Sequence, residues 1–239
     1  MSSTSCEIAV MTSGAFTAAF LELIPRYEAA SRNKIVVATT TMGTGANSIP
    51  SRLQRGEPAD VVIVADSALV NLIKDGMIVA ASRTTLARSA IGMAVRQGAP
   101  KPDISSVEAL KRTLLQAQSL AYSASVSGDY LTTELFPRLG IAEQVMPKSR
   151  RVEGERVGAV VARGAAEIGF QQISELLPIA GIAIVGPLPL EAQKVTVFSA
   201  GVAAGCRNSD AAHALIKFLA SPEAAPAVTK SGLEPTAPS

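Results

Sequence analysis

The stretch KIVVATTTMGTGANSIPSRLQRGEPADVVIVAD, residues 34–66, decides the fold of this chain. It begins with a short apolar run typical of a strand, continues through a loop rich in threonine and glycine, and then becomes helix-like until Gly56. The run ADVVIVAD at its end is almost wholly apolar, as in a parallel strand that is buried on both faces. Strand, loop, helix and strand in this order predict one βαβ unit of a parallel sheet.

The same alternation extends outward in both directions. A strand at residues 7–11 and a helix at 14–31 precede the stretch, and a helix closed by Gly76 follows it. Strand and helix patterns recur at 119–140 and 154–177, and a helix with Ser106 as its N-cap is expected between residues 106 and 117. The chain has 239 residues, 48% of them hydrophobic, which is enough for one large domain or two lobes of the α/β class.

Composition excludes several classes of function. The formal net charge is +2, and with 3 Tyr, 6 Phe and no Trp the chain lacks the basic, aromatic surface of a nucleic-acid-binding protein. No run approaches ~18 apolar residues, so no membrane span is expected. Cys6 and Cys206 are far apart, without metal-site spacing, and are interpreted as free thiols; no metal is expected.

Hydroxyl-rich loops follow several of the predicted strands. Ligands of open α/β sheets bind beyond the carboxyl ends of the strands, where helix N-termini present unpaired N–H groups. Neutral hydroxyls and backbone donors at that edge suit a small anion held by several hydrogen bonds. Ser123, Ser125 and Ser127 alternate in sequence and are expected to share one strand face. The ligand-binding candidates from these loops are Thr12, Ser13, Gly43, Thr44, Ser123, Ser125 and Ser127.

Three motifs carry a resemblance to a known family. They are TMGTGANSIPSRLQRGEPADVVIVAD at residues 41–66, MTSGAF at 11–16 and GAVVARGAAEIGF at 158–170. The chain resembles the molybdate-binding-like type II periplasmic solute-binding proteins from Glu7 to about Leu233. The resemblance implies an α/β fold of two lobes joined by two crossover strands, with the ligand in a cleft between the lobes.

The implied crossovers lie at residues 86–95 and 194–202. Lobe 1 would then consist of residues 1–85 and 200–239, and lobe 2 of residues 86–199. The resemblance further implies a monomer that works with an ABC transporter permease in the periplasm. The first ten residues show no signal peptide, so a periplasmic location requires a leader that this chain lacks, and a native N-terminus here would mean the cytoplasm.

Departures from the family pattern bear on the ligand. Gln172 stands where a tyrosine often contacts molybdate in this family, Arg88 lies on the first predicted crossover, and Arg156 lies near a helix start. A neutral cage would suit molybdate or tungstate, whereas a guanidinium binds a carboxylate bidentately. The expected function is a solute-binding protein for a small anion, either an oxyanion such as molybdate or a small polycarboxylate. Arg88 and Gln172 are therefore expected to set the class of ligand. Arg150 and Arg151 are interpreted as a solvated charge run.

An enzyme is the main alternative. The chain also resembles the branch of this family that includes aconitate isomerase, which moves a proton across an allylic system. The candidate bases are Asp129, Tyr130 and Glu155, none within a catalytic motif, and His213, the sole histidine, lies in a plain helical pattern. The residues by themselves thus favour a binding protein, with isomerase as the alternative.

A weaker alternative is an NAD(P)-dependent oxidoreductase. GTGANS at residues 43–48 imitates a dinucleotide loop, and Asp66 ends the next strand. The third glycine is missing, however, and the loop follows the second predicted strand rather than the first. No cofactor is expected.

Overall fold

A computed structural model describes residues 6–38 and 45–236 of the chain. The chain divides into two compact units, which we call unit 1 (Met1–Arg88 with Val197–Ser239) and unit 2 (Ser89–Thr196). The chain passes between the units twice, at 88/89 and at 196/197, where the sequence analysis placed the changes at 85/86 and 199/200. Each unit has its own sheet.

Unit 1 is built around a six-stranded sheet. Its elements are β1 (Glu7–Thr12), α1 (Gly14–Ser31), β2 (Lys34–Ala38), α2 (Ile49–Gln54), β3 (Val61–Ala65), α3 (Asp66–Lys74), η1 (Ala80–Ser82), β4 (Thr84–Ser89), β10 (Thr196–Val202), α10 (Ser209–Leu219), α11 (Ala225–Lys230) and β11 (Glu234–Pro235). The strand order is β11-β4-β10-β3-β1-β2. β1 runs parallel to β2 and β3, and β10 runs antiparallel to β3, so the predicted βαβ unit is confirmed.

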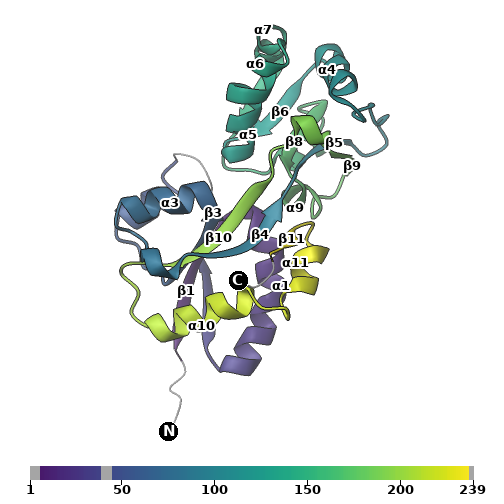
Figure 1. Cartoon of the computed structure of the whole chain (residues 1–239). Coiled ribbons are helices and arrows are strands. Elements are labelled where there is room, and N and C mark those ends of the chain that lie inside the picture. Colours follow the sequence, from purple (N-terminus) through teal and green to yellow (C-terminus); the bar gives the residue numbers. More distant parts are fainter. Residues whose placement is uncertain (1–5, 39–44, 237–239) are drawn as a thin grey trace. The chain divides into compact units, whose positions relative to one another are not determined.

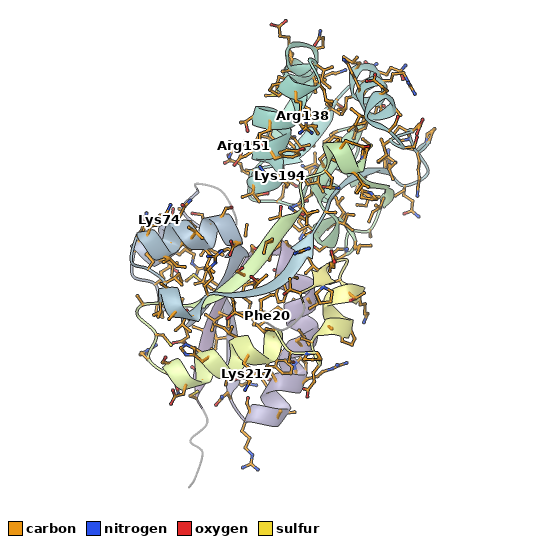
Figure 2. All side chains as sticks on the ribbon, viewed as in Figure 1. Phe20, Lys74, Arg138, Arg151, Lys194 and Lys217 are labelled. Carbon is orange, nitrogen blue, oxygen red and sulfur yellow. The ribbon has the colours of Figure 1, made fainter. Side chains whose placement is uncertain are left out.

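Helices cover both faces of this sheet. On one face α1 packs with α10 and α11 (Figure 1). Phe16 and Phe20 of α1 are completely buried in this layer, and Phe20 is labelled in Figure 2. On the other face α3 packs through Leu69 and Leu72. Alternate residues of β3 pack into the hydrophobic cores on the two faces of the sheet. Because both faces are buried, every position of this strand is apolar. Gly56 and Gly76 follow α2 and α3 with φ of +71°, the left-handed conformation that closes a helix.

Unit 2 is built around a five-stranded sheet. Its elements are β5 (Ile91–Arg96), α4 (Val107–Gln116), β6 (Leu120–Ser123), α5 (Val126–Tyr130), η2 (a π-helical turn, Leu131–Leu135), α6 (Phe136–Arg138), α7 (Ala142–Val145), η3 (Met146–Lys148), β7 (Ser149–Val152), α8 (Val157–Ala162), β8 (Ile168–Gln172), α9 (Ile173–Leu176), β9 (Ile182–Pro187) and η4 (Leu190–Ala192). The order is β7-β6-β8-β5-β9. β6 runs parallel to β7 and β8, whereas β5 is antiparallel to β8 and β9.

The three parallel strands of unit 2 end at a common edge. Ser123, Val152 and Gln172 are the last residues of β6, β7 and β8, and a helix begins shortly after each of them. One face of the sheet is covered by α4 to α7, and the other by α8 and α9. Ser106 caps α4 as predicted, because its hydroxyl accepts a hydrogen bond of 3.1 Å from the backbone N–H of Ala109.

The first predicted crossover strand is in fact two separate strands. Residues 86–95 were expected to form one long strand, but β4 ends at Ser89 and β5 begins at Ile91. The two strands belong to different sheets, and the carbonyl of Ala90 between them accepts a hydrogen bond from the N–H of Ile173 rather than from a strand partner. The second crossover strand, β10, begins at Thr196 rather than at Lys194.

Candidate functional site

Three serine hydroxyls meet at the end of β6 in unit 2. Ser123 Oγ lies 2.7 Å from Ser125 Oγ and 3.0 Å from Ser127 Oγ, and the last two are 3.3 Å apart. We call these three residues the serine trio. The predicted shared strand face is wrong, because the strand ends at Ser123, Ser125 occupies the N-cap position and Ser127 already belongs to α5. The turn from strand into helix brings the hydroxyls together instead.

Gly128 makes this turn possible. A Cβ atom at this position would lie 1.8 Å from the carbonyl oxygen of Ser123, which no side chain could tolerate. The start of α5 therefore approaches the end of β6 more closely than any other residue would allow. Hydroxyl protons rotate freely, so the serine trio can turn donors toward an anion without bringing a charge of its own.

A buried hydroxyl without a partner lies at the corresponding edge of unit 1. Ser13 follows β1 and occupies the N-cap position of the 18-residue helix α1, but its side chain makes no capping bond. Ser13 is 3% exposed, and among the described residues its Oγ has no hydrogen-bond partner. A buried hydroxyl without a hydrogen bond lowers the stability of the fold by ~1–3 kcal/mol relative to a hydrogen-bonded one, so such groups are rare. Thr12, beside it, is also buried, and its hydroxyl donates to the carbonyl of Ser13 at 3.2 Å.

Gly43 and Thr44, predicted for the same edge, lie outside the described residues. Asp66 follows β3 there and is held by two side chains. Arg83 donates to both of its carboxylate oxygens at 2.8 and 2.5 Å, and Ser199 Oγ donates at 2.8 Å. The hydrogen bonds from Arg83 hold the pKa of Asp66 below its ordinary value. Both carboxylate oxygens of Asp66 therefore already accept hydrogen bonds from side chains of unit 1.

Arg88 lies on β4 with an exposed side chain. The register of β4 and β11 places Glu234 opposite it, where an ion pair could form across the strands. Among the described residues, however, no hydrogen bond or ion pair involves the Arg88 side chain. Arg88 is thus a cation without an internal partner in the part of the chain that the structure describes.

Gln172 is buried and hydrogen-bonded within unit 2. With its amide nitrogen toward Ser89, it donates to Ser89 Oγ at 2.8 Å and to the carbonyl of Ala90 at 3.2 Å, and its oxygen accepts from Thr196 Oγ1 at 2.9 Å. These bonds join β8 to the two chain segments that lead to unit 1. The prediction that Gln172 sets the class of ligand stays a prediction, and its observed partners belong to the protein.

Gln171 and Glu175 form a second polar group on the opposite face of β8. Gln171 Oε1 accepts a hydrogen bond of 2.9 Å from the backbone N–H of Val157, the first residue of α8. The Gln171 side chain also hydrogen-bonds the carboxyl of Glu175, and Arg156 Nη1 donates to the Glu175 carbonyl at 3.4 Å. Burial raises the pKa of Glu175 to about 7, against the opposing effects of the Arg156 charge and the Gln171 hydrogen bond.

Sequence reasoning missed Glu175, because no local motif marks it. Arg156, which it did select, occupies the N-cap position of α8. The neighbour of Glu175 is also unusual, because Ser174 is fully buried and its Oγ has no hydrogen-bond partner among the described residues.

The carboxylates predicted as candidate bases are ion-paired. Glu155 accepts from Arg163 at 2.6 and 2.7 Å, and these hydrogen bonds lower its pKa. Asp129 is exposed and lies 3.9 Å from the guanidinium of Arg151, which is labelled beside α5 in Figure 2. Neither carboxylate combines burial with freedom from an ion pair.

Tyr130, the third candidate base, is buried and fully engaged. Its hydroxyl donates to the carbonyl of Ala192 at 3.0 Å and accepts from Arg138 Nη2 at 3.1 Å. Lys194 Nζ lies 4.9 Å from the centre of its ring, and both cations are labelled in Figure 2. A phenol held between a carbonyl and a guanidinium supports packing around α5 more directly than proton transfer.

The remaining polar candidates are structural or solvated. Arg150 and Arg151 are exposed on β7, and His213 lies exposed in α10, where its Nδ1 approaches the carbonyl of Ser209 at 2.8 Å. Cys6 and Cys206 are free thiols, and burial raises the pKa of Cys206 to about 11. Among the described residues no cluster of three His, Cys, Asp or Glu side chains could hold a metal, and no helix has the length and apolarity to cross a membrane.

Comparison with known proteins identifies the family. The model of a family described as bacterial extracellular solute-binding protein matches residues 8–234. The chain belongs to this family. A protein from a Pseudomonas species named aconitate isomerase is 48% identical over 229 residues, which cover 95% of this chain and 87% of that protein.

Solved structures show that this solute-binding protein has the two-lobed type II periplasmic binding protein fold. The periplasmic molybdate-binding protein of Azotobacter vinelandii superposes with a TM-score of 0.72 at 17% identity, covering 97% of this chain and all of the other. The sulfate-binding protein of Mycobacterium tuberculosis gives 0.77 at 16% identity, covering 98% and 88%. The predicted fold class is thereby confirmed. At these identities the likeness concerns the fold alone.

Proposed function

We propose that this protein binds a small polycarboxylate and interconverts the trans and cis isomers of aconitate. The relative named aconitate isomerase, 48% identical over nearly the whole chain, is the observation that carries this proposal. At that identity the relative supports a shared ligand class more strongly than distant structures that bind molybdate or sulfate. The isomerase, kept as the alternative in the sequence analysis, therefore becomes the leading function.

The donors of both units suit such a ligand. Aconitate carries three carboxylates, and each needs hydrogen-bond donors when it leaves water. The serine trio and Ser13 provide hydroxyls that need no counter-charge, and Arg88 provides a cation without an internal partner among the described residues. Each unit thus offers hydrogen-bond donors of a kind that suits a carboxylate.

The isomerisation of aconitate requires a bound substrate and one general base. A base removes a proton from the methylene group of trans-aconitate, and the electron pair of that C–H bond shifts into a new C=C bond. The electrons of the old double bond delocalise toward its terminal carboxylate, and a proton returns at that end of the allylic system. Nothing is oxidised or reduced, and neither water nor a cofactor is consumed. A binding-protein fold needs only a placed base to catalyse this shift.

Proton NMR of trans-aconitate incubated with the purified protein tests the activity. Formation of the cis isomer should scale with protein concentration and disappear after heat inactivation of the sample. Saturable binding of trans-aconitate in calorimetry without any conversion would overturn the isomerase and leave a carboxylate-binding protein.

A second candidate is delivery of an anion to an ABC transporter. The match to extracellular solute-binding proteins over residues 8–234 favours it, and it implies work in the periplasm with a permease as partner. Calorimetry with molybdate, sulfate and both aconitate isomers separates the candidates. Tight binding of molybdate or sulfate with no response to aconitate would make the transporter function the better account.

A further inference from the structure

A half-buried carboxyl group lies beyond the end of β8, at the edge of unit 2 where the parallel strands end. Glu175 belongs to α9, which begins directly after β8. The serine trio follows β6, the neighbouring strand of the same sheet, and the two strands are parallel. The carboxyl ends of parallel strands meet at one edge, so Glu175 and the proposed anion donors of unit 2 belong to the same end of the sheet.

The packing of α8 fixes the surroundings of this carboxyl. A Cβ atom at Gly169 of β8 would lie 2.6 Å from Val161 and 2.7 Å from Val157, so glycine is what lets α8 lie directly on the strand. This brings the first N–H of α8 to the side chain of Gln171, which in turn hydrogen-bonds Glu175. Gln171 thereby fixes the orientation of the Glu175 carboxyl from one side.

The carboxylate of Glu175 forms no ion pair with Arg156, although the charge of Arg156 acts on it. Arg156 donates to the backbone carbonyl of Glu175, and among the described residues no ion pair includes the Glu175 carboxylate. Arg156 and Gln171 are the groups that act on it electrostatically, and burial outweighs them and raises the pKa of Glu175 to about 7. A base should have a pKa near the working pH and no cation bound to it, which excludes Glu155 with its bound Arg163.

The neighbouring hydroxyl is an independent sign of a ligand. Ser174 Oγ is completely buried beside Glu175 and lacks a hydrogen-bond partner among the described residues. A buried polar atom without a partner is rare in a folded protein, and a ligand that accepts its hydrogen bond removes the cost. An unpartnered hydroxyl next to an unpaired carboxyl suits a carboxylate substrate with an acidic C–H bond beside it.

We propose that Glu175 is the catalytic residue that removes the methylene proton of aconitate and returns it to the other end of the allylic system. This inference rests on the isomerase activity proposed above. The carboxylate takes the proton and becomes a carboxylic acid, while the C–H electron pair forms the new C=C bond. The carboxylic acid then gives the proton to the carbon at which the displaced electrons have accumulated. Glu175 ends as a carboxylate, and atoms and charge balance over the cycle.

Glu175→Gln tests the proposal, with Glu143→Gln, an exposed glutamate of α7, as the matched control. For Glu175→Gln, turnover of trans-aconitate should fall 10²–10⁴-fold, the usual contribution of a general base. Its affinity for trans-aconitate in calorimetry should stay within about threefold of the wild type. With the methylene group of trans-aconitate deuterated, the wild type and Glu143→Gln should carry deuterium to the other end of the allylic system, and Glu175→Gln should not.

The pH profile separates a base from a structural residue. The wild-type rate should rise with pH to a plateau with a midpoint near 7. Glu175→Asp, which keeps a carboxyl but moves it, should retain a small activity with a displaced midpoint, and it serves as the informative variant if Glu175→Gln does not fold. A wild-type rate in Glu175→Gln, or an unmoved midpoint in Glu175→Asp, would overturn the role of Glu175 alone. A wild type that converts no aconitate would overturn the proposed function and this inference with it.

Discussion

The hydroxyl of Ser127 lies 3.0 Å from that of Ser123, although one residue belongs to a helix and the other to the strand before it. Both are buried, and Ser125 completes the serine trio from the N-cap position. Among the described residues these three hydroxyls hydrogen-bond only one another, so an anion that accepts from them would replace these bonds with stronger, charge-assisted ones.

Ser127→Ala should weaken binding of the anion. Removing a hydrogen bond to a charged acceptor costs roughly 1.5–3 kcal/mol, so affinity should fall roughly tenfold to a hundredfold. Calorimetry with trans-aconitate measures the change. Ser105→Ala, an exposed serine that precedes α4, is the control and should bind as the wild type does. Equal affinity in all three proteins would remove the serine trio from the site.

Ser13→Ala should change stability and binding in opposite directions. The Ser13 hydroxyl has no partner among the described residues, so its removal should leave the free energy of unfolding unchanged or raise it by about 1 kcal/mol. Binding of trans-aconitate should nevertheless weaken about tenfold if the ligand is the missing partner. Urea unfolding and calorimetry on the same samples measure the two quantities.

Ser106→Ala is the matched control for that pair of measurements. Ser106 caps α4, and loss of a cap typically costs ~1 kcal/mol of stability. Ser106→Ala should therefore lower stability and leave affinity unchanged, the reverse of Ser13→Ala. A loss of stability in Ser13→Ala without any change in affinity would mean that Ser13 serves the fold alone.

The local features of the fold could be predicted because their causes are local. Gly56 and Gly76 end helices because their left-handed backbone suits glycine, and Ser106 caps a helix through a bond that spans three residues. The alternation of strands and helices follows from hydrophobic periodicity, which the sequence displays directly.

The candidate site was less predictable because its contacts join distant residues. Asp66 accepts from Ser199, which is 133 positions away, and Gln171 accepts from Val157, 14 positions away. The environment of Glu175 depends on α8 lying against β8, and no local pattern around residue 175 reports that packing. The break at Ala90 escaped prediction for the same reason, because strands of two different sheets meet there without any turn residue to mark them.

Glu175 should make stability depend on pH. Its pKa is raised from an ordinary 4.5 to about 7 in the folded protein, so the folded state holds the proton more tightly than the unfolded state. Its contribution to the free energy of unfolding is thus greatest below pH 4.5 and is lost as pH rises through 7. The total change in the free energy of unfolding is up to about 3 kcal/mol, because a tenfold change in an acid constant corresponds to about 1.4 kcal/mol.

Glu175→Gln should remove that dependence. Relative to the wild type, the variant should gain stability between pH 5 and pH 8, because the amide has no proton to lose. Urea unfolding of both proteins at the two pH values gives the double difference. A stability difference that is the same at pH 5 and pH 8 would show that the pKa of Glu175 is close to that of the unfolded chain.

Arg88 should distinguish a carboxylate ligand from an oxyanion. Its exposed guanidinium makes no ion pair or hydrogen bond among the described residues, so it is available to a ligand. A charge-assisted hydrogen bond is worth roughly 1.5–3 kcal/mol, so Arg88→Ala should weaken aconitate binding roughly tenfold to a hundredfold. Arg88→Lys should also lose affinity, because lysine keeps the charge but not the planar fork that fits a carboxylate.

Arg26→Ala, which removes an exposed arginine of α1, is the matched control and should bind normally. Calorimetry of these variants with trans-aconitate and with molybdate measures both ligand classes. Wild-type affinity for aconitate in both Arg88 variants would remove Arg88 from the site, and an accompanying tight affinity for molybdate would favour a neutral cage of hydroxyls and backbone N–H groups.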